Sequence, residues 1–244
     1  DCKSLNEYLG CFDTLLKVLQ MEQGLYQAAR DLGVNLKEKG LRYAEVRFAP
    51  QLHCQKGMGQ EQAVAAVLSG LAKAQEDSDI RLRTILCCMR GQDNKQENLQ
   101  TVRLASRYLG RGVAAVDLAG AEALFPTADY EEEFALAREL GVPFTIHAGE
   151  AAGPASIRKA VEFGAARIGH GVRAIEDEEL MELLASREIP LEMCPISNLQ
   201  TKAVENIADY PLRTYLRRGI TVTVNSDNMT VSDTWVGKEF QYLA

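Results

Sequence analysis

The sequence lacks the features that are typical of membrane proteins, of nucleic-acid-binding proteins and of secreted proteins. None of its apolar runs approaches the roughly 18 residues of a transmembrane helix, and its first residues lack the apolar core of a signal peptide. The 27 basic residues are outnumbered by 34 acidic ones, and a net charge of −7 disfavours binding to phosphate backbones. These absences predict a cytoplasmic protein without membrane or nucleic-acid partners, and no sequence feature fixes its oligomeric state.

Two further signatures are missing. The cysteines contain no CxxC pair and no regular spacing, so we expect reduced and mostly buried thiols. Cys87 and Cys88 are neighbours in an expected strand, and their side chains should therefore point to opposite faces. No expected strand is followed by a GxGxxG or GxxxxGK[ST] loop, which disfavours a doubly wound nucleotide-binding fold.

Seven segments are apolar along most of their length, which predicts strands that are buried on both faces, as in a parallel sheet. Between them lie segments with apolar residues at helical spacing. This alternation favours an α/β protein of the barrel type. The seven segments are "RYAEVRFAP" (42–50), "LRTILCCMR" (82–90), "GVAAVDLAG" (112–120), "VPFTIHAGE" (142–150), "ARIGHGV" (166–172), "IPLEMCPIS" (189–197) and "ITVTVNSDN" (220–228).

The intervening helices have recognisable faces and ends. Pro154 and Gly164 mark the start and the end of one helix, because proline suits the first turn and glycine the position after the last. Two others are expected to bury an apolar stripe. The stripes consist of Val64, Val67, Leu68 and Leu71 in the first helix and of Phe134, Leu136 and Leu140 in the second.

The number of strands falls one short of a closed barrel of the TIM type, which needs eight. The first 41 residues read as helical throughout and supply no eighth strand. Seven strands would leave two long apolar edges unpaired. We therefore expect residues 1–244 to form a single, incomplete (β/α)8 barrel domain whose first βα unit is missing, as part of a longer polypeptide.

Polar residues gather at or just past the carboxyl ends of these strands, the face on which barrels of this class build their active sites. Two imidazoles and two carboxylates among them suit metal-assisted hydrolysis. Taken singly, each could instead be a hydrogen-bonded structural residue or part of an Asn/Asp turn. The basic members and Asp117 are expected to pair with one another. The residues are Arg47, Arg90, Asp117, His147, Glu150, His170 and Asp227.

Several motifs, in their order along the chain, resemble those of the adenosine deaminase family of the amidohydrolase superfamily. They are "FTIHAGE", "RIGHGV", "LEMCPISN" and "TVNSDN", and "EVRFAP", "ILCCMRG" and "VDLAGAE" match the family's earlier strands. The resemblance covers essentially the whole chain. It implies a (β/α)8 barrel with one zinc ion, a small-molecule purine nucleoside as its partner, and hydrolytic deamination, first of all of adenosine to inosine and ammonia.

The resemblance also implies roles for the residues that carry the chemistry. His147 and Asp227 would bind zinc, and Asp227 would also hold the attacking water. His170 would orient and deprotonate that water. Glu150 would protonate the purine nitrogen N1, which a carboxylic acid can do where a partly desolvated site raises its pKa.

The substrate contacts are implied in the same way. Gly120 would offer its backbone amide to the purine N3. Asn228 stands where many relatives have a second aspartate that contacts N7, and its NH2 group can still donate a hydrogen bond there. Two roles are open for Ser197: it could support the residues around the metal, or its hydroxyl could stabilise a turn.

One departure from the family pattern keeps alternatives open. The family's first strand carries an HxH motif that completes the zinc site, and this sequence has none, since His53 does not match it. With two histidine ligands absent, the isolated chain is expected to hold zinc poorly and to be inactive. The alternatives are a deaminase of adenine or another 6-aminopurine derivative, and a non-catalytic nucleoside-binding paralogue.

Overall fold

A computed structural model describes residues 4–244, so Cys2 lies outside the described residues. The chain divides into two compact units. The first comprises the residues up to Phe12 together with Leu118–Phe134 and Phe144–Ala244, and the second comprises Asp13–Asp117 and Ala135–Pro143. The candidate site residues belong to the first unit, apart from those expected to pair around Asp117.

The second unit contains a three-stranded sheet in the order β1-β2-β3, in which β1 and β2 are parallel. Helices α3 and α4 pack closely in this unit because glycines allow it: a Cβ at Gly70 would collide with the carbonyl oxygen of Tyr26. The elements are α2 (Phe12–Val18), α3 (Glu22–Glu38), β1 (Tyr43–Phe48), η1 (Pro50–His53), α4 (Gln60–Glu76), β2 (Arg81–Met89), α5 (Lys95–Tyr108) and β3 (Val113–Ala119).

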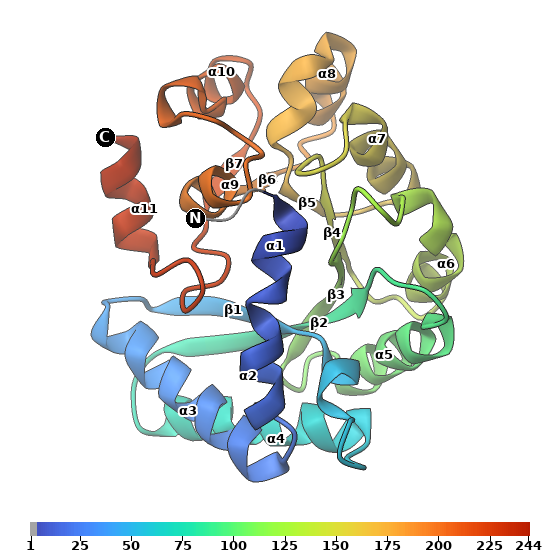
Figure 1. The fold of residues 1–244 in the computed structure, drawn as a ribbon, viewed down its shortest axis with the longest axis vertical. Coiled ribbons are helices and arrows are strands. Elements are labelled where there is room, and N and C mark those ends of the chain that lie inside the picture. The colour runs from blue at the N-terminus through green and yellow to red at the C-terminus, as the bar shows by residue number, and fades with distance from the viewer. Residues whose placement is uncertain (1–3) are drawn as a thin grey trace. The chain divides into compact units, whose positions relative to one another are not determined.

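The first unit contains a four-stranded sheet in the order β4-β5-β6-β7, in which each neighbouring pair is parallel. Figure 1 shows α7 and α8 on the outer side of these strands. The elements are α1 (Leu5–Gly10), η2 (Thr127–Tyr130), β4 (Thr145–Ala148), α7 (Pro154–Phe163), β5 (Arg167–His170), η3 (Val172–Glu176), α8 (Glu178–Ser186), β6 (Leu191–Met193), α9 (Pro195–Gln200), η4 (Ile207–Asp209), α10 (Leu212–Arg217), β7 (Val222–Val224) and α11 (Val236–Leu243). Helix α6 (Glu131–Glu139) continues from this unit into the other.

The predicted elements are confirmed in number and type within the described residues. All seven strands form where the apolar runs lie, and residues 4–41 contain helices but no strand. Helix α7 begins at Pro154 and is closed by Gly164, whose φ of +94° is the left-handed conformation that glycine adopts without strain. The later strands are shorter than the runs, so Glu150 and Asp227 lie beyond the strand ends.

One predicted apolar stripe is wrong in part. Leu140 was expected on the buried face of its helix, but α6 ends at Glu139 and the Leu140 side chain is 38% exposed. The chain turns at Gly141, whose φ is +67°. Phe134 is fully buried, as predicted, and Ala137, about one turn further on, is fully buried as well, so these two side chains anchor the helix.

The cysteines within residues 4–244 are free, as predicted. Cys87, Cys88 and Cys194 are buried, whereas Cys54 is partly buried and Cys11 is exposed. Cys87 faces the Asp117 carboxylate and Cys88 faces the Asn98 carbonyl, which fits opposite sides of β2. Burial, followed by the charge of Asp117, raises the pKa of the Cys87 thiol and keeps it protonated.

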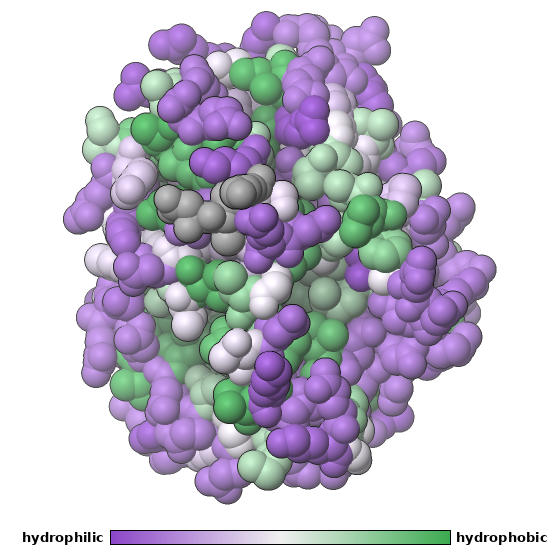
Figure 2. All heavy atoms as spheres, viewed as in Figure 1, coloured by the Kyte–Doolittle hydropathy of each residue, from purple (hydrophilic) through white to green (hydrophobic). Residues whose placement is uncertain are grey.

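The face drawn in Figure 2 carries mostly hydrophilic side chains, with hydrophobic ones in scattered groups. Across residues 4–244, none of the helices combines the length and the apolar character needed to cross a bilayer.

Candidate active site

The two histidines of the predicted site lie on neighbouring parallel strands. His147 of β4 is in register with Gly169 of β5, and Ala148 is in register with His170. The imidazole rings of His147 and His170 lie with their centroids 5.0 Å apart. A Cβ at position 169 would lie 3.1 Å from the His147 Cα and 3.3 Å from its Cγ, so glycine at this position lets the ring approach β5.

The backbone is unusual at two of the predicted residues. His170 has a φ of +62° and Asp227 a φ of +52°, both in the left-handed region that residues with a Cβ rarely adopt. Such conformations cost roughly 1–3 kcal/mol each and gather at functional sites, where the surrounding structure holds them. His170 ends β5 and Asp227 lies three residues past the end of β7, and the positive φ of each supports a functional interpretation.

Glu150 lies two residues past β4 with its side chain almost completely buried at 6% exposure. Its Oε1 accepts hydrogen bonds from the Thr201 hydroxyl at 2.9 Å and from the Asn198 amide nitrogen at 3.3 Å. Its Oε2 lies 3.4 Å from His170 Nε2. The structure thus brings Glu150 and His170 together, as the sequence predicted, and adds two donors that the sequence did not reveal.

Asn198 joins these groups into one buried network. Its amide nitrogen lies 3.0 Å from Nδ1 of His170, and its oxygen accepts a hydrogen bond from the Tyr210 hydroxyl at 3.0 Å. This contact joins the Asn198 amide group to the imidazole ring of His170, in addition to its contact with the Glu150 carboxyl. Asn198 lies within the motif "LEMCPISN", but its contacts reach residues 28 and 48 positions away.

Asp227 is held by a hydroxyl from α9. The Ser197 hydroxyl donates a hydrogen bond to Asp227 Oδ2 at 2.7 Å, which favours the reading of Ser197 as a partner of this carboxylate over that of a turn residue. Nearby, the Tyr8 hydroxyl lies 2.6 Å from the Ser232 hydroxyl. Burial, followed by the negative charge of Asp227, raises the pKa of Tyr8 and keeps its hydroxyl protonated.

These side chains form a donor set of the kind that zinc binds. Among residues 4–244, ligand atoms of His170, Cys194 and Asp227 lie within 4.8 Å of one another. Imidazole nitrogen, thiolate sulfur and carboxylate oxygen are the three ligand types of zinc sites. His147 is not part of this group of three, although its ring lies beside that of His170. The chemistry of the donors fits the metal that the sequence implied.

The two predicted substrate contacts lie on turns. Gly120 directly follows β3 and has a φ of +111°, a conformation that requires glycine. The Asn228 oxygen accepts a hydrogen bond from the Val231 amide at 2.7 Å. A hydrogen bond from Asn228 to a ligand would therefore come from its NH2 group, as the sequence interpretation requires.

The expected pairing around Asp117 is confirmed for Arg47, whose Nη1 lies 3.0 Å from the buried Asp117 carboxylate. Arg90 is buried in the same unit, and its participation stays a prediction. His53 is a structural residue: its Nδ1–H donates to the Leu19 carbonyl at 2.7 Å, and burial lowers the pKa of its imidazole.

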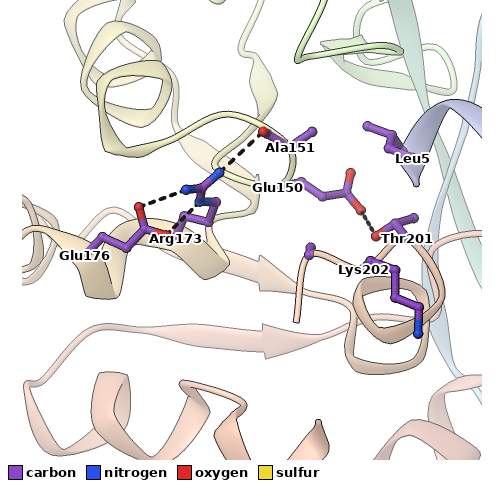
Figure 3. Close-up of a pocket in the computed structure, with 8 residues that line it drawn as sticks. Leu5, Glu150, Ala151, Arg173, Glu176, Thr201 and Lys202 are labelled. Atoms are coloured by element: carbon purple, nitrogen blue, oxygen red, sulfur yellow. Dashed lines mark hydrogen bonds and ion pairs between the residues drawn. The ribbon is translucent and has the colours of Figure 1, made fainter. Parts of the chain in front are cut away.

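A cavity of about 380 Å³ opens beside Glu150. Figure 3 shows Glu150 bonded to Thr201 on one wall and Arg173 bonded to Glu176 and to the Ala151 carbonyl on another. This volume is within the range of small-molecule sites, which starts near 300 Å³. The lining residues are Leu5, Glu150, Ala151, Arg173, Glu176, Thr201, Lys202 and Ala203.

Both the sequence and the fold are similar to those of known proteins. The sequence matches the adenosine deaminase family over residues 1–244. An adenosine deaminase of Haemophilus ducreyi is 56% identical over 248 residues, which cover 100% of this chain and 72% of the relative. An adenine deaminase structure from Arthrobacter aurescens superposes with a TM-score of 0.91 at 29% identity, covering 99% of this chain and 74% of that one.

A zinc-bound amidohydrolase of Burkholderia ambifaria shares the fold, with a TM-score of 0.84 at 22% identity, covering 91% of this chain and 62% of that one. The structural likeness confirms the predicted α/β fold of the TIM-barrel type. The family match over the whole chain and the close relative confirm the resemblance seen in the motifs. This chain belongs to the adenosine deaminase family of hydrolases.

Proposed function

We propose that the protein deaminates a purine nucleoside, converting adenosine and water to inosine and ammonia. Family membership supports deamination of a purine. One observation carries the assignment to this site: the buried Glu150 carboxyl lines a cavity of ligand size and contacts His170 through its Oε2. A proton donor and a proton acceptor thus lie side by side where a small molecule has room.

Glu150 would act as the acid. When water adds to C6 of the purine, electron density moves toward N1, and a proton delivered there stabilises charge that develops only in the transition state. Thr201 and Asn198 both donate to Oε1, which leaves Oε2 as the oxygen that carries the transferable proton.

His170 would orient the attacking water and take its proton. The contact between Nε2 and the Glu150 carboxyl lets the two groups exchange a proton between steps. The water oxygen stays on C6, the C6–N6 bond breaks, and the two water protons end on N1 and on the departing ammonia. Atoms and charges therefore balance without a further reactant.

A zinc ion is proposed as the cofactor, one per intact chain, with His147 and Asp227 among its ligands. When bound, zinc would lower the pKa of water to about 7 and make the nucleophile available at neutral pH. The Ser197 hydroxyl donates to Asp227 Oδ2 and so orients its carboxylate. The fold neighbour with bound zinc supports the proposal, and so does the group of His170, Cys194 and Asp227, which shares Asp227 with the proposed ligands.

Substrate orientation would come from the two turns. Gly120 would donate its backbone N–H to N3 of the purine, and Asn228 would donate from its NH2 group to N7. A second candidate is adenine itself, which the likeness to an adenine deaminase structure favours. Turnover measured with adenine, adenosine and AMP at equal concentrations separates these substrates.

The test uses Glu150→Gln in the natural full-length protein. The glutamine keeps the shape of the side chain and the Thr201 contact but has no acid proton, so adenosine turnover should fall by about 10²- to 10⁴-fold. Bound zinc should stay at the wild-type level. The matched control is Glu176→Gln, which lines the same cavity and should keep turnover within about threefold. A zinc-loaded wild type that leaves adenosine absorbance unchanged would overturn the proposal.

Two broader expectations accompany this function. We propose that residues 1–244 act as one barrel domain of the intact protein, which limited proteolysis of that protein checks. A cytoplasmic location is tested by cell fractionation.

A further inference from the structure

A buried carboxylate that takes no part in these steps lies directly behind Glu150. Glu122 follows β3 and is only 3% exposed. Its Oε1 accepts a hydrogen bond from the Gly149 amide at 2.8 Å. Its Oε2 accepts from the amides of Glu150, Ala151 and Ala152 at 3.1, 2.8 and 2.9 Å. Four successive backbone N–H groups thus converge on one side chain.

A fifth donor completes this carboxylate site. The Ser156 hydroxyl lies 2.5 Å from Glu122 Oε1, and it is itself contacted by the Thr127 hydroxyl at 2.8 Å. Successive N–H groups that point inward form a concavity that ordinarily binds a phosphate or another free anion. In this chain the anion is a side chain that comes from a different strand end.

The same count of donors excludes a direct chemical role for Glu122. An ionised carboxylate offers about four lone-pair positions, and five donors already occupy them. Glu122 has no free position from which to accept a proton from water or substrate. Its effect on the reaction must therefore pass through the segment that it binds.

We propose that Glu122 is the positioning residue of the catalytic acid: it fixes the backbone of residues 149–152 and thereby aims the Glu150 carboxyl. The inference rests on the function proposed for Glu150. The Glu150 side chain leaves from the middle of the bound segment, and its oxygens meet Thr201, Asn198 and His170 at 2.9–3.4 Å. A displacement of about 1 Å would break these contacts, and misplacement on that scale can cost about 10²-fold in rate.

Gly149 explains why an external anchor is needed. Its φ of +73° makes the sharp turn after β4, and a Cβ there would lie 2.7 Å from Cγ1 of Ile157. Glycine supplies this turn but adds backbone freedom and no side chain to restrain it. The Glu122 carboxylate restores the restraint through the main chain.

The experiment compares Glu122→Gln with wild type in the natural full-length protein. The glutamine has the same size, but its NH2 group faces N–H donors and cannot accept from them. We expect kcat for adenosine to fall by about 10- to 100-fold while KM changes by less than about threefold, since the acid acts only in the transition state. The stability control is Asp177→Asn, which weakens the pair with Arg158 and the start of α8 away from Glu150. It should lower Tm and leave kcat unchanged.

A binding measurement distinguishes misplacement of the Glu150 carboxyl from a general disruption of the binding site. Inosine carries a hydrogen on N1 that the aligned Glu150 carboxylate can accept, whereas 1-deazainosine has carbon in that place. Glu122→Gln should weaken inhibition by inosine about 10-fold and leave inhibition by 1-deazainosine unchanged. Equal weakening of both ligands would show a purely structural role and overturn the inference.

The outcomes distinguish this inference from the proposed function. A wild type without adenosine deamination overturns both. An active wild type together with Glu122→Gln at a kcat within threefold overturns only the role of Glu122. If Glu122→Gln does not fold, Ser156→Ala serves as the test because it removes one of the five donors. It should lower kcat by less than Glu122→Gln would and leave KM nearly unchanged. An unchanged kcat in that variant overturns the inference as well.

Discussion

Replacing Asn198 by alanine tests the buried network that joins Glu150 to His170. The substitution removes the partner of His170 Nδ1 and the acceptor of the Tyr210 hydroxyl. Burial raises the pKa of Tyr210, so its hydroxyl remains a protonated donor that needs an acceptor. Each buried polar group left without a partner costs about 1–3 kcal/mol, and two such groups give about 2–6 kcal/mol of lost unfolding free energy. For a chain of this size, each kcal/mol lowers Tm by about 2–4 °C.

The assay is a double-mutant cycle read by urea and thermal unfolding. Tyr210→Phe removes the hydroxyl that Asn198→Ala leaves unsatisfied, so the double variant should be more stable than the sum of the single effects by about 1 kcal/mol. Tyr242→Phe, at an exposed tyrosine, is the control and should lie within about 0.5 kcal/mol of wild type. Additive effects, or a total loss below about 1 kcal/mol for Asn198→Ala, would refute the reasoning.

Three further predictions concern the metal site and the pH dependence of folding. Gly169→Ala would place a Cβ 3.3 Å from the His147 Nδ1 and should weaken zinc binding about 10-fold in a chelator competition. The control is Gly10→Ala, whose added Cβ meets no atom within 4 Å and which should leave zinc binding unchanged. Chelation of the full-length protein should abolish adenosine turnover and added zinc should restore it; full activity in the metal-free protein would contradict the proposed cofactor. Burial lowers the pKa of His53 below its ordinary 6.5. The unfolded chain therefore binds a proton at this imidazole more readily than the folded chain does. The free energy of unfolding should fall as the pH drops from 6.5 through the lowered pKa. In His53→Gln, urea unfolding between pH 7.5 and 5 should show a smaller decline, and an identical decline would rule out His53 as its source.

The strands and their order were accessible from the sequence because apolar runs bounded by turn residues carry their own signal. The flanking glycines of His170 were also informative: a Cβ at Gly171 would lie 2.7 Å from Leu191 Cδ2, and Gly169 faces the His147 ring. The end of α6 was missed because Leu140 keeps the helical spacing of an apolar stripe after the helix has ended. Periodicity alone does not report where a chain turns.

The residues that organise the site could not be found by the same reasoning. Asn198 reaches Glu150 across 48 positions and His170 across 28, and Glu122 reaches the loop after β4 across 27 to 30. Local sequence patterns contain no information on such pairings. Both residues lie in motifs that resemble the family's, but their partners become visible only when the strand ends are placed side by side.

The way in which Glu122 binds its loop has a consequence for how the cavity could diversify. Its partners in residues 149–152 are main-chain N–H groups, which every amino acid except proline provides. The side chain at position 151 lines the cavity, yet the anchoring of its segment does not depend on it. Substitutions at position 151, in evolution or by design, could therefore alter substrate preference while the neighbouring Glu150 carboxyl keeps its orientation.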